Sequence, residues 1–288
     1  MISEIFSPKT KAELLATLQQ LSAKPFHFGA GYTDLLMDFK QQPDAPETVL
    51  NLAQIKDPSF EGIKEQEKGI YIGALTKIAR LAENESLKNQ FPVLQQAAES
   101  LASSQIREVA TLGGNLCTAS PAGDVSCALV ALQSICYLLS AQGSLRKIPI
   151  HEFFTGVRKT AMKPDELLQG IFIPANHASK VHSAFIKVGT RRSMECSVIS
   201  MAYHIQLDDQ EKITDAGLAI GSAAPVIRFP EKAKNFLIGK QWKGFSAADA
   251  DTFAELVAAY ADPISDIRAT AWYRLVVLKN ISRSIFEF

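Results

Sequence analysis

The sequence has no excess of charge of either sign. Its 288 residues include 30 Lys and Arg against 30 Asp and Glu, so the formal net charge is zero. A protein that binds nucleic acid through its phosphates needs a basic excess or a basic stripe on its surface. We therefore expect no nucleic-acid partner.

Long apolar runs are also missing. The longest, 128–139, is interrupted by Gln133 and Ser134, whereas a membrane span needs about 18 to 20 apolar residues. The first ten residues contain Glu4 and lack the basic and then apolar segments of a secretion signal. These absences predict a cytoplasmic protein with no membrane span.

Cysteine is scarce, and the cysteines stand singly. None of the four is part of a Cys-x-x-Cys spacing or of a Cys/His cluster, which zinc and iron–sulfur sites require. We predict reduced thiols and no metal site, so that any metal chemistry belongs to another chain. The four are Cys117, Cys127, Cys136 and Cys196.

Hydrophobic residues, in contrast, make up 47% of the chain and charged residues 21%, which is typical of globular proteins. The length suits one large domain or two ordinary ones. Ser7 and Pro8 suit a helix start, and Leu14, Leu18 and Leu21 follow at helical spacing. Further elements expected in the first part are strands at 26–28, 48–52, 69–74 and 171–173, helices at 76–83, 91–104 and 125–133, and a hairpin of 136–139 with 145–150.

The pattern changes near residue 175, where Pro174 ends a strand and the polar residues 176–179 suggest a linker. Three strands of an antiparallel meander are expected next, and three helices after them. This grouping predicts an α+β protein whose second half is an antiparallel sheet plus helices. The strands are 184–188, 198–206 and 216–221, and the helices are 230–238, 247–260 and 265–281.

The first segment suited to chemistry is 28–35, Phe-Gly-Ala-Gly-Tyr-Thr-Asp-Leu. Glycine lets main-chain N–H groups approach an anion closely, and Thr33 adds a hydroxyl donor. A Rossmann fingerprint would place a third glycine where Asp34 stands, so that interpretation is poor. On these residues alone, a tight turn between strands is an equal alternative.

The second segment is 111–115, Thr-Leu-Gly-Gly-Asn, with Ser-Pro-Ala-Gly-Asp close behind it. Its paired glycines again allow close approach, and Thr111 and Asn115 offer side-chain donors. Asp124 suits the hydroxyls of a ribose or ribityl chain, although a role as helix N-cap explains it equally well. Two such segments far apart in the sequence favour a long ligand with an anionic centre, such as a dinucleotide.

These segments resemble a known family. Residues 29–35 resemble the Ala-Gly-Gly-Thr-Asp-Leu loop of the FAD-binding subunits of molybdenum hydroxylases, which include the xanthine dehydrogenase and aerobic carbon monoxide dehydrogenase flavoproteins. Residues 111–124 resemble the family's Thr-Ile-Gly-Gly-Asn…Ala-Ser-Pro…Asp signature, and 266–274 its Asp-x-Arg-Ala-Ser-Ala-x-Tyr-Arg segment. The likeness runs in order over almost the whole chain and also covers 151–156, 165–168 and Lys187 followed by Arg191 and Arg192.

The resemblance implies an α+β fold in two domains. The first, over 1–175, is a two-subdomain FAD-binding domain of the vanillyl-alcohol-oxidase/PCMH type, with subdomains of about 1–60 and 61–175. The second, over 180–288, is a smaller α+β C-terminal domain like that of the carbon monoxide dehydrogenase flavoprotein. FAD is expected between the two subdomains.

The resemblance also implies a set of cofactor-binding residues, with no catalytic side chain among them. The pyrophosphate would lie on 29–35, and 111–115 would approach it from the other subdomain. Asp124 would bind the hydroxyl-bearing chain, Leu168 would place main-chain groups near the cofactor, and Lys187 would reach it from the C-terminal domain. The full set is Gly29, Ala30, Gly31, Tyr32, Thr33, Asp34, Leu35, Thr111, Gly113, Gly114, Asn115, Asp124, Leu168 and Lys187.

The sequence departs from the family pattern in two places. Tyr32 stands where a second glycine is usual, so its side chain either points away from the pyrophosphate or packs on the cofactor. Residues 193–198 differ from the family's usual Asp/Glu-x-Ala/Asp-Ile-Ala. Since the resemblance implies that this region faces the flavin, the electronic tuning of the flavin and the electron acceptor are left open.

The function that the resemblance implies is electron transfer. Hydroxylation would take place at a molybdenum cofactor on a large partner subunit. Electrons would then cross [2Fe–2S] clusters on a small partner subunit, reach FAD in this chain and leave to NAD⁺ or another acceptor. Two alternatives stay open: a stand-alone FAD-dependent reductase of the same superfamily, and a flavin-free scaffold, which only Tyr32 suggests.

Overall fold

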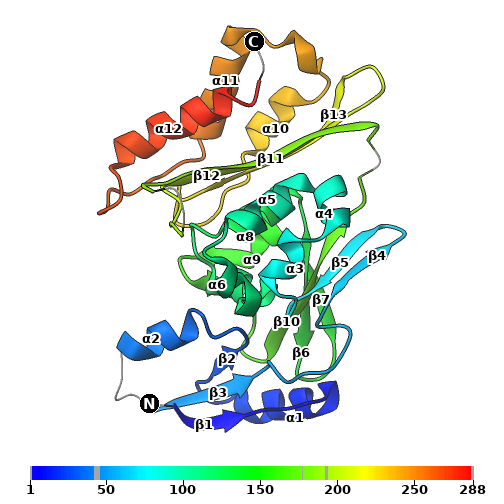
Figure 1. The fold of residues 1–288 in the computed structure, drawn as a ribbon, viewed down its shortest axis with the longest axis vertical. Helices are drawn as coiled ribbons and strands as arrows, with labels where there is room; N and C mark the ends of the chain where they lie inside the picture. The colour runs from blue at the N-terminus through cyan, green and yellow to red at the C-terminus, as the bar shows by residue number, and fades with distance from the viewer. Residues whose placement is uncertain (1, 42–45, 177, 192–193, 287–288) are drawn as a thin grey trace.

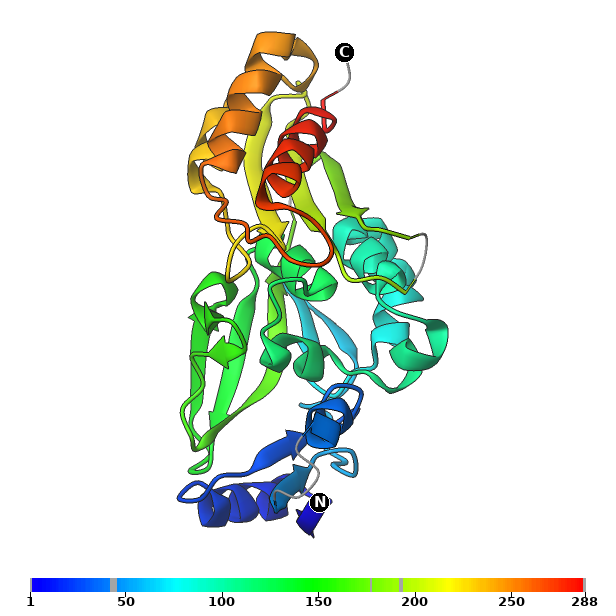
Figure 2. The same ribbon diagram turned by 90° about the vertical axis from the view of Figure 1, so that its left-hand side faces the viewer.

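The fold is described by a computed structural model over residues 2–41, 46–176, 178–191 and 194–286. Three larger sheets lie one above the other along the long axis of the molecule (Figure 1), and the view turned by 90° shows the same order (Figure 2). The expected α+β class is confirmed. Arg192 and Ser193, which the sequence analysis names, lie outside the described residues.

The lowest sheet in Figure 1 is parallel, with the strand order β1-β3-β2. Its helix α1 begins later than Ser7 and Pro8 suggest, because Thr10 is the N-cap and accepts a hydrogen bond from Glu13 N at 3.2 Å. Leu14 and Leu18 are fully buried in a core that includes Leu50 of β3. The elements are β1 (Ile2–Phe6), α1 (Lys11–Leu21), β2 (His27–Gly29), α2 (Leu35–Gln41) and β3 (Glu47–Asn51).

The middle sheet is antiparallel, with the order β4-β5-β10-β6-β7, and short helices cover one of its faces (Figure 1). Helix α8 is buried along its whole length, which explains its largely apolar sequence. The expected hairpin is present as β6 and β7. The strands are β4 (Ile63–Gln66), β5 (Gly69–Gly73), β6 (Ile135–Ser140), β7 (Leu145–Pro149) and β10 (Glu166–Pro174).

Two expectations for this part need correction. The segment 111–115, expected as a loop, forms the first turn of helix α7. The expected helix over 91–104 ends at Ser100 and is followed by a separate helix, α6. The helices are α3 (Ile78–Ala82), α4 (Glu85–Gln90), α5 (Pro92–Ser100), α6 (Ser104–Val109), α7 (Leu112–Thr118), α8 (Asp124–Ala131) and α9 (Ile150–Phe153), beside a small hairpin of β8 (Phe154–Gly156) and β9 (Lys159–Thr160).

The third sheet, β11-β12-β13, is the expected antiparallel meander. One face packs on α5 and α8 of the middle part and the other on α10, α11 and α12 (Figure 1). Successive residues of β12 alternate between the faces, since Met201 joins the core under the helices and Ala202 the core of the middle part. The elements are β11 (Lys180–Val188), β12 (Ile199–Leu207), β13 (Ile213–Gly221), α10 (Glu231–Leu237), a 3₁₀ turn (Trp242–Gly244), α11 (Ala247–Ala258) and α12 (Ala271–Arg283).

Within the described ranges, every helix is too short or too polar to cross a membrane.

Candidate functional site

A cavity of about 950 Å³ lies where the three parts of the molecule meet. Its walls come from segment 30–35 at the edge of the parallel sheet, from segment 110–124 of the middle part, and from 194–196, which leads into the C-terminal sheet. Cavities of this size accommodate large organic ligands. The two glycine-rich segments of the sequence thus share one site.

Segment 30–34 follows the carboxyl end of β2, where Gly29 O still accepts a hydrogen bond from Leu52 N at 2.7 Å. Beyond that point, the main-chain N–H groups of residues 30–34 have no hydrogen-bond acceptor within the described part of the chain. Five successive donors therefore stand at the carboxyl edge of a parallel sheet, beside a cavity. Such an arrangement suits an anion.

Segments 30–34 and 110–118 are in direct contact. A Cβ atom at Gly31 would lie 2.3 Å from the Val109 carbonyl oxygen, so only glycine allows this approach. The Thr118 hydroxyl donates to Asp34 Oδ2 at 3.0 Å. Asp34 thus ties α7 to the first segment.

The second segment differs from expectation in its main-chain donors. Thr111 is the N-cap of α7 and accepts from Gly114 N at 3.0 Å. Leu112 N donates to Thr76 O and Gly113 N to Ala74 O, at 2.9 and 2.7 Å. These N–H groups donate hydrogen bonds within the protein, so they are not available to a ligand. The segment instead lines the cavity with Gly113 and Gly114 and with the side chain of Asn115.

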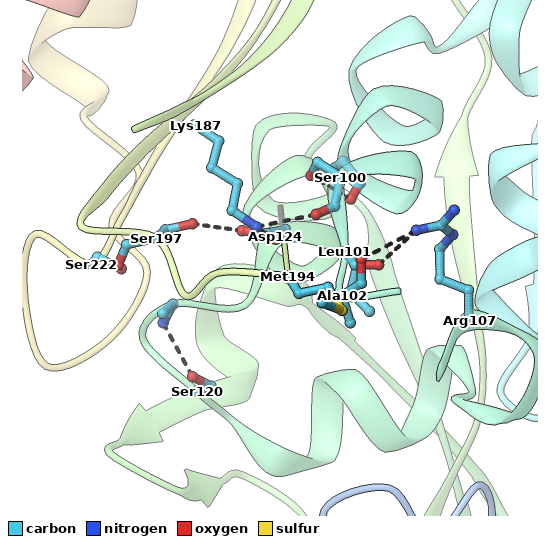
Figure 3. A network of polar contacts seen from close by, with 12 residues as sticks. Ser100, Leu101, Ala102, Arg107, Ser120, Asp124, Lys187, Met194, Ser197 and Ser222 are labelled. Atoms are coloured by element: carbon cyan, nitrogen blue, oxygen red, sulfur yellow. Dashed lines mark hydrogen bonds and ion pairs between the residues drawn. The ribbon is translucent and has the colours of Figure 1, made fainter. Parts of the chain in front are cut away.

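Asp124 forms a buried ion pair instead of an N-cap. It is the first residue of α8, whose N-cap is Gly123. Its Oδ2 accepts from Lys187 Nζ at 2.6 Å, and its Oδ1 from the Ser197 hydroxyl at 2.8 Å (Figure 3). Burial raises the pKa of the Asp124 carboxyl, and the ion pair and the hydrogen bonds oppose that rise.

The Lys187 ammonium lies between two parts of the molecule. Besides Asp124, it donates to Ser100 O at the end of α5, at 3.2 Å (Figure 3). The Lys187 side chain is only 11% exposed, and the residue stands behind the cavity wall rather than in it. Its contacts therefore neutralise Asp124 and fix β11 to the middle part.

Hydrogen bonds also fix the third wall of the cavity, residues 194–196, to its surroundings. The Ser222 hydroxyl donates to Ser197 O at 2.9 Å, and Ser222 N to Pro121 O at 2.7 Å. Arg191 N donates to the Glu195 carboxylate at 2.7 Å. Segments 120–124 and 194–197 are thereby fixed to one another.

Comparison with known proteins identifies the family. A family model described as the FAD binding domain in molybdopterin dehydrogenase matches residues 1–176, and one described as the CO dehydrogenase flavoprotein C-terminal domain matches residues 184–287. The chain belongs to the FAD-binding subunits of the molybdenum hydroxylases.

Individual relatives agree with this assignment. The nicotinate dehydrogenase FAD-subunit of Eubacterium barkeri is 31% identical over 82% of this chain and 79% of its own length. The glyceraldehyde dehydrogenase medium chain of Sulfolobus acidocaldarius is 30% identical over 90% of this chain and 88% of its own. A chain in the structure of the carbon monoxide dehydrogenase from Hydrogenophaga pseudoflava matches with a TM-score of 0.89 and 25% identity, over 99% of this chain and 96% of that one.

Most of the flavoprotein residues expected from the sequence meet at this cavity. Its lining includes all of them except Gly29 and Lys187. Gly29 directly precedes segment 30–34 in the chain. Leu168 of β10 lies in the wall beside Leu167. The five N–H donors of residues 30–34, which lack an acceptor among the described residues, and a cavity of this volume fit a long ligand with a diphosphate centre, as FAD has.

Sequence reasoning missed several wall residues of the flavoprotein. Arg158 forms an ion pair with Asp38 of α2 and so joins the β8–β9 hairpin to the parallel sheet. The resemblance over 151–156 stops just short of Arg158, and reading it two residues further would have reached this position. The other missed residues include Met37, Leu101, Ile106, Cys117, Val157 and Met162, whereas Met194, Glu195 and Cys196 lie in the region that the resemblance placed at the flavin.

Cys117 is one of the two cysteines in the wall. Burial raises the pKa of the Cys117 thiol to about 12, so this thiol stays protonated at neutral pH. All four cysteines are free thiols. Over the described ranges, no group of three His, Cys, Asp or Glu residues is placed to hold a metal ion.

Proposed function

We propose that FAD lies in this cavity with its diphosphate on the main-chain N–H groups of residues 30–34. The observation that carries the proposal is the row of five donors without an acceptor within the described residues, at the carboxyl edge of β1-β3-β2. Main-chain dipoles suit this chain, whose net charge is zero and whose cavity wall has no cluster of basic side chains among the residues that the structure describes. The contact of Gly31 with Val109 keeps the donors beside the second segment.

The remaining site residues shape and support the cavity. Gly113, Gly114 and Asn115 form the wall opposite the donors, and Leu168 closes it from β10. Asp124 faces the cavity, and Lys187 compensates its charge from behind. When FAD is bound, it supplies the ability to accept and release electrons, and the chain contributes binding, orientation and electrostatics.

We further propose that the electrons come from [2Fe–2S] clusters on a small partner subunit and leave to NAD⁺ or another acceptor. Substrate hydroxylation would take place at a molybdenum cofactor on a large partner subunit. Membership of the family supports this scheme, as do relatives that are themselves named as an FAD-subunit or a medium chain. The division into domains over 1–175 and 180–288 and a cytoplasmic location are part of the same proposal.

The test is native purification followed by flavin, metal and subunit analysis. We expect a yellow complex with FAD, molybdenum, iron and two further subunits. A yellow protein without molybdenum and iron would favour the stand-alone reductase instead. A colourless protein that takes up no FAD would favour the scaffold.

A further inference from the structure

Tyr32 has an unusual main-chain conformation in the middle of segment 30–34. Its φ is 60°, in the left-handed region that glycine adopts freely and a bulky residue rarely does. Strained residues of this kind are concentrated at functional sites, where the surrounding structure compensates the strain. Because glycine would relieve the strain, the presence of tyrosine calls for a role of its side chain.

The ring of Tyr32 lies on the cavity wall. It folds back over Gly29, where an added Cβ atom would be only 2.5 Å from Cζ and Oη of the tyrosine. Tyr32 lines the cavity together with Ala30, Gly31 and Thr33. The phenol therefore stands beside the start of the row of N–H donors.

The hydroxyl of Tyr32 has no hydrogen-bond partner within the described residues. Burial raises the pKa of this phenol, so at neutral pH it is protonated and able to donate. A partly buried donor beside other unpaired donors indicates that they share one acceptor-rich ligand.

We propose that the Tyr32 hydroxyl donates a hydrogen bond to the diphosphate of FAD. This inference rests on the proposed function. It adds one side-chain donor to the main-chain row, at a position where the usual glycine offers none. A hydrogen bond to a phosphate oxygen is charge-assisted and is about twice as strong as one between neutral groups.

The test compares Tyr32→Phe with the wild type in the natively purified protein after its flavin has been removed. The variant keeps the ring and its packing on Gly29 and loses only the hydroxyl. Titration with FAD, ADP and riboflavin locates the contact, because the first two carry a diphosphate and the third does not. We expect the Kd values of FAD and ADP to rise about ten- to a hundredfold, while that of riboflavin stays unchanged.

Tyr273→Phe is the matched control, because Tyr273 lies on α12 outside the cavity wall and is exposed. It should leave all three Kd values unchanged. Unchanged ADP binding by Tyr32→Phe would overturn the inference, and so would a loss of riboflavin binding as large as that of FAD, which would place the phenol against the flavin ring. A wild-type protein that binds no FAD would instead overturn the proposed function.

Discussion

The Asp124–Lys187 pair shows how far apart in the sequence two residues of one site can lie. Asp124 begins a helix in the middle part, while Lys187 is on a strand of the C-terminal sheet. The sequence offered two roles for Asp124, N-cap and cofactor ligand, and the resemblance offered a role beside the cofactor for Lys187. In the structure, the two residues form an ion pair between segments far apart in the sequence, which no local pattern predicts.

Lys187→Met is expected to destabilise the protein by about 3–5 kcal/mol, because it leaves the Asp124 carboxylate buried without its cation. Urea unfolding at neutral pH, without added flavin, measures the loss. The double variant with Asp124→Asn should recover part of it, since the uncompensated charge is then gone. A loss below about 1 kcal/mol in the single variant would contradict this expectation, because exposed ion pairs contribute that little to stability.

Gly31→Ala should weaken FAD binding and cost about 1–3 kcal/mol of stability. The added methyl group would lie 2.3 Å from Val109 O, so the two segments must separate. Flavin retained after gel filtration and thermal unfolding are the measurements. Gly244→Ala is the control, since its Cβ would meet Gln241 at an ordinary 3.5 Å. Full flavin retention by Gly31→Ala would contradict the close approach of the two segments.

At the scale of elements, the sequence predicted most of the long ones well and the short ones poorly. The helix expected over 265–281 is an exception, because it begins only at Ala271, after the N-cap Thr270. The β6–β7 hairpin and the C-terminal meander follow from their alternating patterns. Helix α7 was expected as a loop, because paired glycines are unfavourable inside a helix. Thr111 was the signal that could have found it, since a threonine three residues before Gly114 is positioned as an N-cap.

Thr111→Ala should destabilise the protein by about 1–2 kcal/mol, since it removes the acceptor of Gly114 N at a buried helix start. Thr111→Ser keeps the hydroxyl and should remain within about 0.5 kcal/mol of the wild type. Chemical denaturation of both variants measures the difference. Equal stability of the two variants would mean that the cap contributes little.

At the scale of the molecule, the cavity depends on how three parts pack together. The sequence indicated both glycine-rich segments, and the resemblance placed them on one ligand. The resemblance also associated residues 193–198 with the flavin, but not the contacts that bring 194–196 to the cavity, which come from the packing of β12 and β13 on α8. Such walls arise from tertiary contacts, so they cannot be read from local composition or periodicity.

We expect His204 to make the packing of the C-terminal sheet on α5 sensitive to pH. It is 4% exposed on β12, against Phe91 at the start of α5, and its Nδ1 lies 3.1 Å from the Ser183 hydroxyl. Its Nε2 is buried without a partner among the described residues. Burial lowers the pKa of His204 to about 4, although Asp215 opposes the shift.

Because the folded protein binds this proton less readily than the unfolded chain, stability should fall as the pH drops from about 6.5 towards 4. The full loss is about 3 kcal/mol. Urea unfolding of the wild type and of His204→Gln at a series of pH values tests this expectation. The variant lacks the titrating group, so its stability should fall less steeply over that range. Parallel curves for the two proteins would show that His204 does not govern the acid sensitivity of the packing between the C-terminal sheet and α5.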